Sequence, residues 1–383
     1  MQYSTFAAID IGSYDVILEI FEISKKQGIR SVDKICHRME LGKDTYTLGK
    51  IRPEMEEELC RVLADFVRIM EDYRVDDYRA TASSAISEAS NSLYVLGKIH
   101  QLTGLSVTVL SNSEQRFLSY KALAAMEDNF NKIIEKGTAI LDLDGGSFQI
   151  SLFDKDALVT TQNIRMGSLR IRERLAGIQS ETEHYEEMVE ELIWNEVSSF
   201  KKMYLKDRKI ENIMLIGDVF TDSVYQNIEE KTTKIISREN FNTWYEKIIR
   251  QSPMELAVKL GIPLENASLM YPSAVIYKCL IDMMGAEHIW IPGVHMTRGI
   301  AYEYAEQMKL LKGGHNFEND ILMAAKNIGK RYAVNRPHVQ NLEMTALAMF
   351  DATKKMHGMK ERERLLLQMA VMLHDVRKIH QFQ

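Results

Sequence analysis

One pattern occurs twice in this chain, once near the N-terminus and once near the middle. In each copy an apolar run that carries an aspartate leads into a turn containing glycine and serine, and a second apolar run follows, over residues 6–20 and 138–152. Apolar runs on both sides of a short glycine-containing turn predict a β-hairpin. The repetition at domain-scale separation therefore predicts two related domains, each built on one hairpin.

The two turns have the residue types of phosphate-binding loops. Glycine has no Cβ, so the backbone N–H groups at Gly12, Gly145 and Gly146 can approach a phosphate closely. Ser13 and Ser147 add a hydroxyl to each turn. A single turn of this kind is common for backbone reasons alone, but the duplication favours two loops that bind a phosphate chain across a cleft.

Aspartates accompany both turns. Asp10 and Asp142 precede the turns, and Asp144 lies inside the second one. Carboxylate oxygens hold hydrated divalent cations. These three residues are therefore the candidate ligands of Mg²⁺ or Mn²⁺.

Composition excludes several functional classes. At about 150 residues per domain, 383 residues predict two to three domains. The net charge of −6 gives no overall attraction to nucleic acid. The N-terminal residues have neither the basic start of a signal peptide nor the length of a membrane span. Three scattered cysteines, Cys36, Cys60 and Cys279, favour a reduced cytoplasmic location.

Strands and helices alternate over most of the chain, which indicates an α/β fold. Ser111 and Glu114 have the spacing of a capping box and predict a helix start. From residue 312 onward the pattern is helical throughout. We expect the methionines between 344 and 373 to pack into a core.

Further motifs join the two hairpins. Together they resemble the exopolyphosphatase and guanosine pentaphosphate phosphohydrolase family, Ppx/GppA. The resemblance extends through the whole chain. The segments that carry it are residues 8–13, 110–115, 140–147, 166–170, 217–221 and 297–299.

The resemblance implies a fold. Two ribonuclease H-like domains of the actin, Hsp70 and sugar kinase superfamily would flank a cleft, over residues 1–134 and 135–311. An all-α, HD-like helical segment would follow over 312–383, ending soon after Asp375 where longer members continue. His338, His374 and Asp375 have the look of HD-type metal ligands or of structural remnants of such a site.

The resemblance also implies an activity. The substrate would be polyphosphate or a guanosine polyphosphate, cleaved with Mg²⁺ or Mn²⁺ by a cytoplasmic protein that forms a homodimer. Arg170 and Arg298 would be phosphate ligands. No membrane or nucleic acid partner is expected.

The chain departs from the family pattern at catalytic positions. Gln115 stands where the family has its general base, and Gln149 replaces a second glutamate. An expected arginine is Ser87, and the turn that normally begins with glycine begins with Asp144. Glutamine can orient a water but cannot accept its proton. Glu114 is next in sequence and is the alternative base.

Three functions therefore stay open. The first is a phosphohydrolase. The second is a catalytically weakened regulatory protein that binds polyphosphate or nucleotide. The third is an interaction protein with a vestigial cleft. Retention of both aspartate-containing turns argues against the third. The family resemblance favours the first function, whereas the substitutions at 87, 115 and 149 favour the second on physical grounds.

Overall fold

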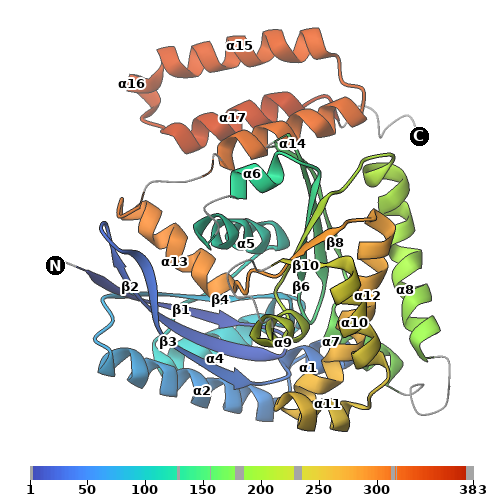
Figure 1. Ribbon diagram of the computed structural model, residues 1–383. Helices are drawn as coiled ribbons and strands as arrows, with labels where there is room; N and C mark the ends of the chain where they lie inside the picture. The colour runs from blue at the N-terminus through green and yellow to red at the C-terminus, as the bar shows by residue number, and fades with distance from the viewer. Residues whose placement is uncertain are drawn as a thin grey trace.

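Two β-sheets form the centre of the computed structural model, which describes residues 3–126, 130–155, 157–176, 185–227, 235–311, 315 and 317–376. Helices cover both sheets, and a layer of helices from the C-terminal part of the chain lies at one end (Figure 1). The α/β class predicted from the alternating pattern is confirmed.

The first sheet has the strand order β3-β2-β1-β4-β5. Its first three strands form an antiparallel meander, and β4 and β5 are parallel to β1. Two long helices, α2 and α4, pack their apolar faces against it. The elements are β1 (Ser4–Ile11), β2 (Asp15–Ser24), β3 (Gly28–Arg38), β4 (Asp77–Ala82), β5 (Val107–Val109), α1 (Leu41–Leu48), α2 (Pro53–Asp72), α3 (Ser84–Ser87) and α4 (Ser92–Thr103).

The second sheet repeats this arrangement and adds an edge strand, in the order β10-β11-β9-β6-β7-β8. Again three antiparallel strands are followed by two parallel ones. Its strands are β6 (Thr138–Leu143), β7 (Phe148–Asp154), β8 (Ala157–Ile164), β9 (Asn212–Ile216), β10 (Ile235–Ser237) and β11 (His288–Trp290). Its helices are α7 (Ser168–Leu175), α8 (Tyr185–Phe200), the π-helix η1 (Lys201–Leu205), α9 (Val219–Asn227), α10 (Arg238–Ile249), α11 (Pro253–Leu260) and α12 (Leu264–Met284).

Both predicted hairpins are present. Strand β1 pairs with β2 and β6 pairs with β7, each across the turn that the sequence indicated. Most residues of these strands are apolar, as expected for strands that are buried on both faces. In β1, for example, Ile9 packs under α2 while Phe6 and Ala8 face the helix α13 (Met296–Gln307).

Helix α13 follows the second sheet in sequence but packs against the first. It contacts β1 and the helix α5 (Asn112–Met126), which runs beside the second sheet (Figure 1). Gly299 permits this approach, because a Cβ there would lie 2.0 Å from the carbonyl oxygen of Leu118. The α5–α13 pair thus connects the two sheets at the level of the hairpin turns.

The remaining helices form the end layer. α14 (Phe317–Arg331) packs on β8 and α17 (Glu361–Leu373), and α15 (Arg336–Ala352) packs along α17. Two short helices complete the described elements, α6 (Phe130–Ile134) and α16 (Lys354–His357). No helix in these described ranges is long and apolar enough to cross a membrane.

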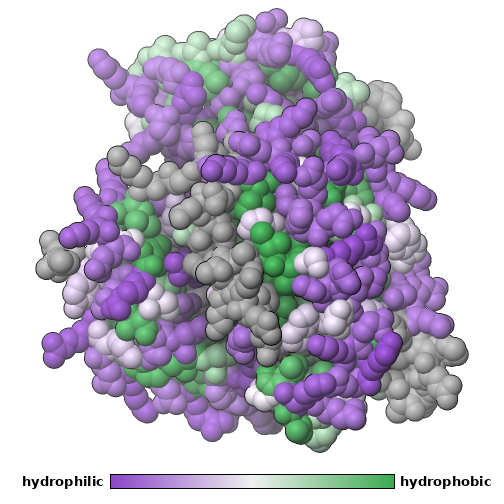
Figure 2. Space-filling view, in the orientation of Figure 1, coloured by the Kyte–Doolittle hydropathy of each residue, from purple (hydrophilic) through white to green (hydrophobic). Residues whose placement is uncertain are grey.

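The methionine prediction for this layer is wrong for several residues. Met344, Met349 and Met356 are 66%, 64% and 87% exposed, whereas Met372 is buried as expected. Figure 2 shows pale green atoms along the outer edge of this layer, above otherwise hydrophilic surface. The reason is that α15 contacts other helices on one side only, so its opposite side has nothing to pack against.

Candidate functional site

A cavity of about 150 Å³ lies where the turns of the two hairpins meet. Its walls come from both hairpins, β3, α5 and residues 294–296. Five aspartates line it: Asp10 and Asp15 from the first hairpin, Asp142 and Asp144 from the second, and Asp222 from α9. The cavity therefore collects carboxylates from segments more than 120 residues apart in sequence.

The hairpin register places these carboxylates. Asp10 lies next to the end of β1, opposite Ile17, and Asp142 has the corresponding place in β6, opposite Gln149. Both strands end at the same cavity, and both side chains line it. Ser119 of α5 donates a hydrogen bond of 2.6 Å to Asp142 Oδ2 and fixes that carboxylate.

Burial raises the pKa of the four aspartates that come from the hairpins. The pKa of Asp10 is raised well above its usual value, first by desolvation and then by repulsion from Asp15, Asp144 and Asp142. Desolvation raises the pKa of Asp142 to about 6, although Ser119 and Arg116 oppose the rise. The site is therefore a cluster of acidic groups that repel one another at neutral pH.

These residues fit a divalent cation. Asp10 Oδ1 is buried and finds no hydrogen-bond partner in the described part of the chain, so a lone pair points into the cavity without compensation. The three predicted ligands do not form a compact, preformed site. Among the described residues, the only group whose ligand atoms all lie within 4.8 Å of one another is a different one, in the end layer. Such a loose oxygen set suits Mg²⁺, which usually keeps several of its waters.

The acidic cluster makes stability depend on pH. Its carboxyl groups bind protons more tightly in the folded chain than in the unfolded one, so the stabilisation is complete below about pH 4 and is lost as the pH rises through about 6. We expect the metal-free protein to melt at a lower temperature at about pH 8 than at about pH 5.5. Mg²⁺ should recover part of the loss at the higher pH.

Thermal melts with and without chelator check this prediction. The Asp142→Asn variant is the matched control, because the amide keeps the shape but cannot titrate, and its melting temperature should change less between the two pH values. A metal-free wild type that becomes more stable from about pH 5.5 to 8 would contradict the prediction.

Of the two neighbouring residues Glu114 and Gln115, only one reaches the cavity. Glu114 is exposed, accepts hydrogen bonds from Ser111 N (2.9 Å) and Oγ (2.7 Å), and caps α5. This confirms the predicted capping box and leaves Glu114 outside the cavity lining. Adjacent helical residues point about 100° apart, so Gln115 instead lines the cavity.

Gln115 meets a carboxylate there. Desolvation raises the pKa of Asp144 to about 6, and this rise is opposed by hydrogen bonds from the Gly145 N–H and from the side chain of Gln115. Asp144 Oδ1 accepts from Gly145 N at 2.7 Å. The carboxylate of Asp144 in the second turn therefore lies next to Gln115. The family pattern has glycine at position 144 and so has no carboxylate there.

The predicted phosphate-binding turns contact each other. The hydroxyl of Ser13 is fully buried and bonds to Tyr46 Oη at 2.7 Å and to Ser84 Oγ at 3.3 Å. A Cβ at Gly145 would lie 3.0 Å from Ser13 Cβ, and one at Gly146 would lie 2.1 Å from Tyr46 Oη. Consequently, of the glycines and serines predicted to bind phosphate in the two turns, only Gly12 lines the cavity. Gly145, Gly146, Ser13 and Ser147 lie in this contact or behind it.

The two predicted phosphate-binding arginines do not line the cavity either. Arg170 donates two hydrogen bonds to Glu88, at 3.1 and 2.9 Å, and its guanidinium stacks on Tyr46 at 3.9 Å. Arg298 is half-buried beside Glu19, and its Nε has no partner among the described residues. Sequence motifs predicted that both arginines bind phosphate. In the structure, the ion pair with Glu88 determines where the side chain of Arg170 lies, and the packing of α13 determines where that of Arg298 lies.

Gln149 is 3% exposed and does not line the cavity. It lies opposite Asp142 in the β6–β7 pair, and its buried Oε1 makes no hydrogen bond in the described residues.

Sequence reasoning missed several residues at the cavity. Asp15 and Arg38 face each other across β2 and β3 and form an ion pair of 2.9 Å. Lys34 and His295 line the cavity with Arg38. A signal for Ser119 was available, because it follows Gln115 by four residues and so shares its side of the helix. The others depend on strand register and on the loop before α13.

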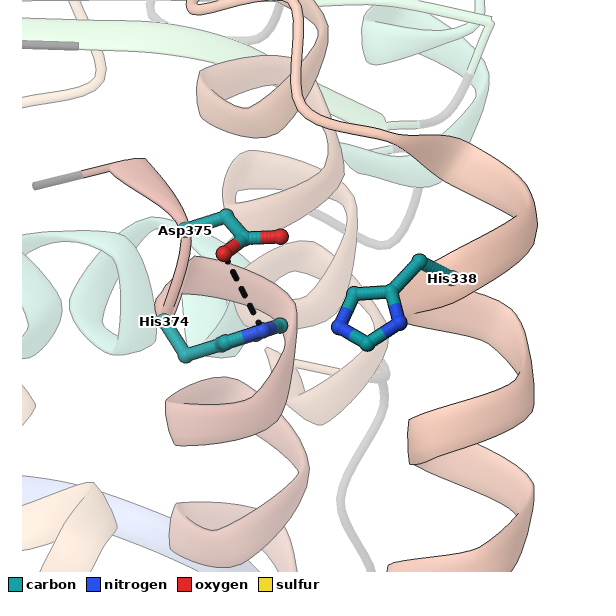
Figure 3. A group of neighbouring side chains, drawn as sticks. All are labelled: His338, His374 and Asp375. Atoms are coloured by element: carbon teal, nitrogen blue, oxygen red, sulfur yellow. Dashed lines mark ion pairs between the residues drawn. The ribbon is translucent and has the colours of Figure 1, made fainter. Parts of the chain in front are cut away.

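A separate cluster lies in the end layer. His338, His374 and Asp375 bring three ligand atoms within 4.8 Å of one another (Figure 3). His374 Nδ1 lies 2.7 Å from the carbonyl oxygen of Val371, and its Nε2 lies 3.3 Å from Asp375 Oδ1. A donor role for Nδ1 would leave Nε2 free to hold a metal. The HD-like character of these helices remains a prediction, and residues 377–383 lie outside the described ranges.

Two sheets of matching strand order, with hairpin aspartates meeting in one cavity, define a two-sheet α/β protein of the actin-like fold class. The chain belongs to the Ppx/GppA phosphatase family, whose model matches residues 19–308. The family predicted from the sequence motifs is therefore confirmed.

Individual relatives are distant. The chain is 21% identical over 310 residues to a bifunctional 3-dehydroquinate synthase/phosphatase of Fusobacterium nucleatum, covering 74% of this chain and 44% of that protein. It is 19% identical over 377 residues to a guanosine-5'-triphosphate,3'-diphosphate pyrophosphatase of Photobacterium profundum, covering 97% and 72%. The structure of an exopolyphosphatase from Cytophaga hutchinsonii has a TM-score of 0.70 at 17% identity, covering 79% and 98%, and shows the same fold.

Proposed function

We propose that the chain is a phosphohydrolase that releases terminal phosphate from polyphosphate or from a guanosine polyphosphate in the cavity between the two sheets. The convergence of Asp10, Asp142 and Asp144 with Gln115 in one cavity carries this proposal. Family membership supports the reaction class.

Asp10 and Asp142 are the residues that would hold Mg²⁺ or Mn²⁺. When bound there, the cation neutralises the carboxylates and the charge on the phosphate oxygens. Ser119 keeps Asp142 oriented through its hydrogen bond. Arg38 and Lys34 add positive charge on the cavity wall, which favours entry of an anion once a bound cation has neutralised the aspartates.

The remaining polar pair would act on the attacking water. Gln115 offers an amide that positions a water but cannot take its proton. Asp144 faces Gln115 and offers the carboxylate that the family carries at position 115. We infer that Asp144 is the general base in this chain. The exchange of glutamate for glutamine at 115 would then be compensated by the aspartate at 144.

A second function has its own support. The turns that would bind phosphate are in contact with each other, and Arg170 is held by Glu88. Both observations favour a protein that binds polyphosphate or nucleotide without efficient turnover and responds by domain movement. The homodimer and the cytoplasmic location remain predictions from the sequence.

Phosphate release from linear polyphosphate and from guanosine pentaphosphate with Mg²⁺ tests these functions. We expect release by the wild type and its loss in Asp142→Asn, because the amide removes a metal ligand. Glu114→Gln is the matched control and should keep full activity, since Glu114 lies outside the cavity. Saturable binding without release would establish the second function. Neither binding nor release would overturn both.

A further inference from the structure

A group of cations lies away from the cavity at the hairpin turns, where η1 and α14 meet β8. Lys206 and Arg208 follow η1, and Lys330 and Arg331 end α14. These four side chains line one pocket of about 310 Å³, and no carboxylate lines it. Asp207 is exposed next to them but is not part of the pocket wall.

The same positive surface continues along α14. A neighbouring pocket of about 380 Å³ shares Asn327 and Lys330 with the first and adds Lys326 and Arg336. Its one carboxylate, Glu343, accepts a hydrogen bond from Gln368 at 2.7 Å. We call the six cations the basic strip: Lys206, Arg208, Lys326, Lys330, Arg331 and Arg336.

Within the described residues, no member of the basic strip forms an ion pair. No paired carboxylate in this part of the chain therefore offsets the mutual repulsion of these cations. Cations in the last turn of α14 are favoured by the helix dipole, which accounts for Lys330 and Arg331. The dipole of α14 does not account for Lys206 and Arg208. They follow a different helix, η1, and their charges repel Lys330 and Arg331.

Local structure holds these cations in place. The guanidinium of Arg331 stacks over Tyr204 at 4.2 Å, and Arg208 Nη1 donates to the Tyr204 carbonyl at 3.5 Å. Lys206 ends the π-helix with φ 50° and ψ −130°, a conformation rare outside glycine. π-Helical turns and such strained residues are retained mostly where they position functional groups.

We propose that the basic strip is an anion site for a short phosphate chain with several negative charges, such as an inorganic oligophosphate or the phosphates of a nucleotide. Cations from two walls can contact successive phosphates, and arginine binds phosphate oxygens through paired N–H groups. The strip contains no metal-binding carboxylate cluster, so it binds phosphate without a divalent cation. It does not depend on activity in the cavity.

Calorimetric titration of the full chain with tripolyphosphate in the presence of chelator tests the proposal. Without a metal the acidic cavity repels the anion, so binding under these conditions reports on the strip. We expect saturable binding by the wild type. The double variant Lys206→Gln/Arg331→Gln should bind tripolyphosphate more weakly, with the affinity reduced about tenfold or more for each side chain removed. A nucleoside triphosphate in a parallel titration distinguishes the two sources of the phosphate chain.

The matched control is Lys25→Gln/Lys26→Gln, which removes the same charge from an exposed β2–β3 turn and should bind like the wild type. Phosphate release with Mg²⁺ should be equal in all three proteins. Three outcomes would overturn the proposal: no saturable binding up to about 1 mM, equal loss in the control variant, or binding of an oligonucleotide but not of tripolyphosphate.

Discussion

Loss of Asp144 alone is expected to abolish most phosphate release. Moving the carboxylate from position 144 to position 115 is expected to restore it. The single change Asp144→Gly should lower the release rate by about 10²–10⁴, the usual effect of losing a general base. The double variant Asp144→Gly/Gln115→Glu should recover most of that loss. The reason is that residues 115 and 144 meet in the same cavity, so a carboxylate at either place reaches the same water.

The four proteins of this cycle separate the roles of Asp144. Release should be measured over a range of Mg²⁺ concentrations for the wild type, both single variants and the double variant. A base lowers the maximal rate when it is removed and leaves the Mg²⁺ dependence unchanged. If Asp144→Gly instead raises the Mg²⁺ requirement, Asp144 is a metal ligand. If Gln115→Glu alone is as fast as the double variant and Asp144→Gly has no effect, the base assignment is wrong.

Gly299→Ala is expected to destabilise the protein by about 1–3 kcal/mol, the usual cost of overpacking. A Cβ at this position would lie 2.0 Å from the Leu118 carbonyl oxygen and 2.7 Å from its carbon. These are backbone atoms of α5, so the contact is relieved only if α5 and α13 move apart. That movement would also disturb Ser119, the residue after Leu118, and with it the orientation of Asp142.

Urea denaturation measures this effect. The matched control is Gly97→Ala in α4, where a Cβ meets no atom within 4 Å. It should stabilise by about 0.5–1 kcal/mol, because alanine is the better helix former. Two glycine-to-alanine changes in helices are thus predicted to have opposite signs. Equal effects for the two would show that helix propensity, and not the α5–α13 contact, governs Gly299.

Local patterns predicted much of the fold. Both hairpins and the cap at Ser111 and Glu114 appear where their residues indicated. Each of these depends on contacts between residues close in sequence. The exposed methionines of α15 were mispredicted because periodicity identifies one side of a helix but not whether anything packs against it.

The sequence by itself identified Asp10, Asp142, Asp144 and Gln115 as site residues, and all four line the cavity. It also determined that glutamate is absent from positions 115 and 149. Only the tertiary structure decided which of the predicted residues share that cavity. Arg170 was assigned to phosphate by its motif, yet Glu88, 82 residues away, holds it in an ion pair. Asp144 gained its partner Gln115 from a different element in the same way. Chain order carries no information on such pairings, because they arise only when the two sheets and the α5–α13 pair pack together.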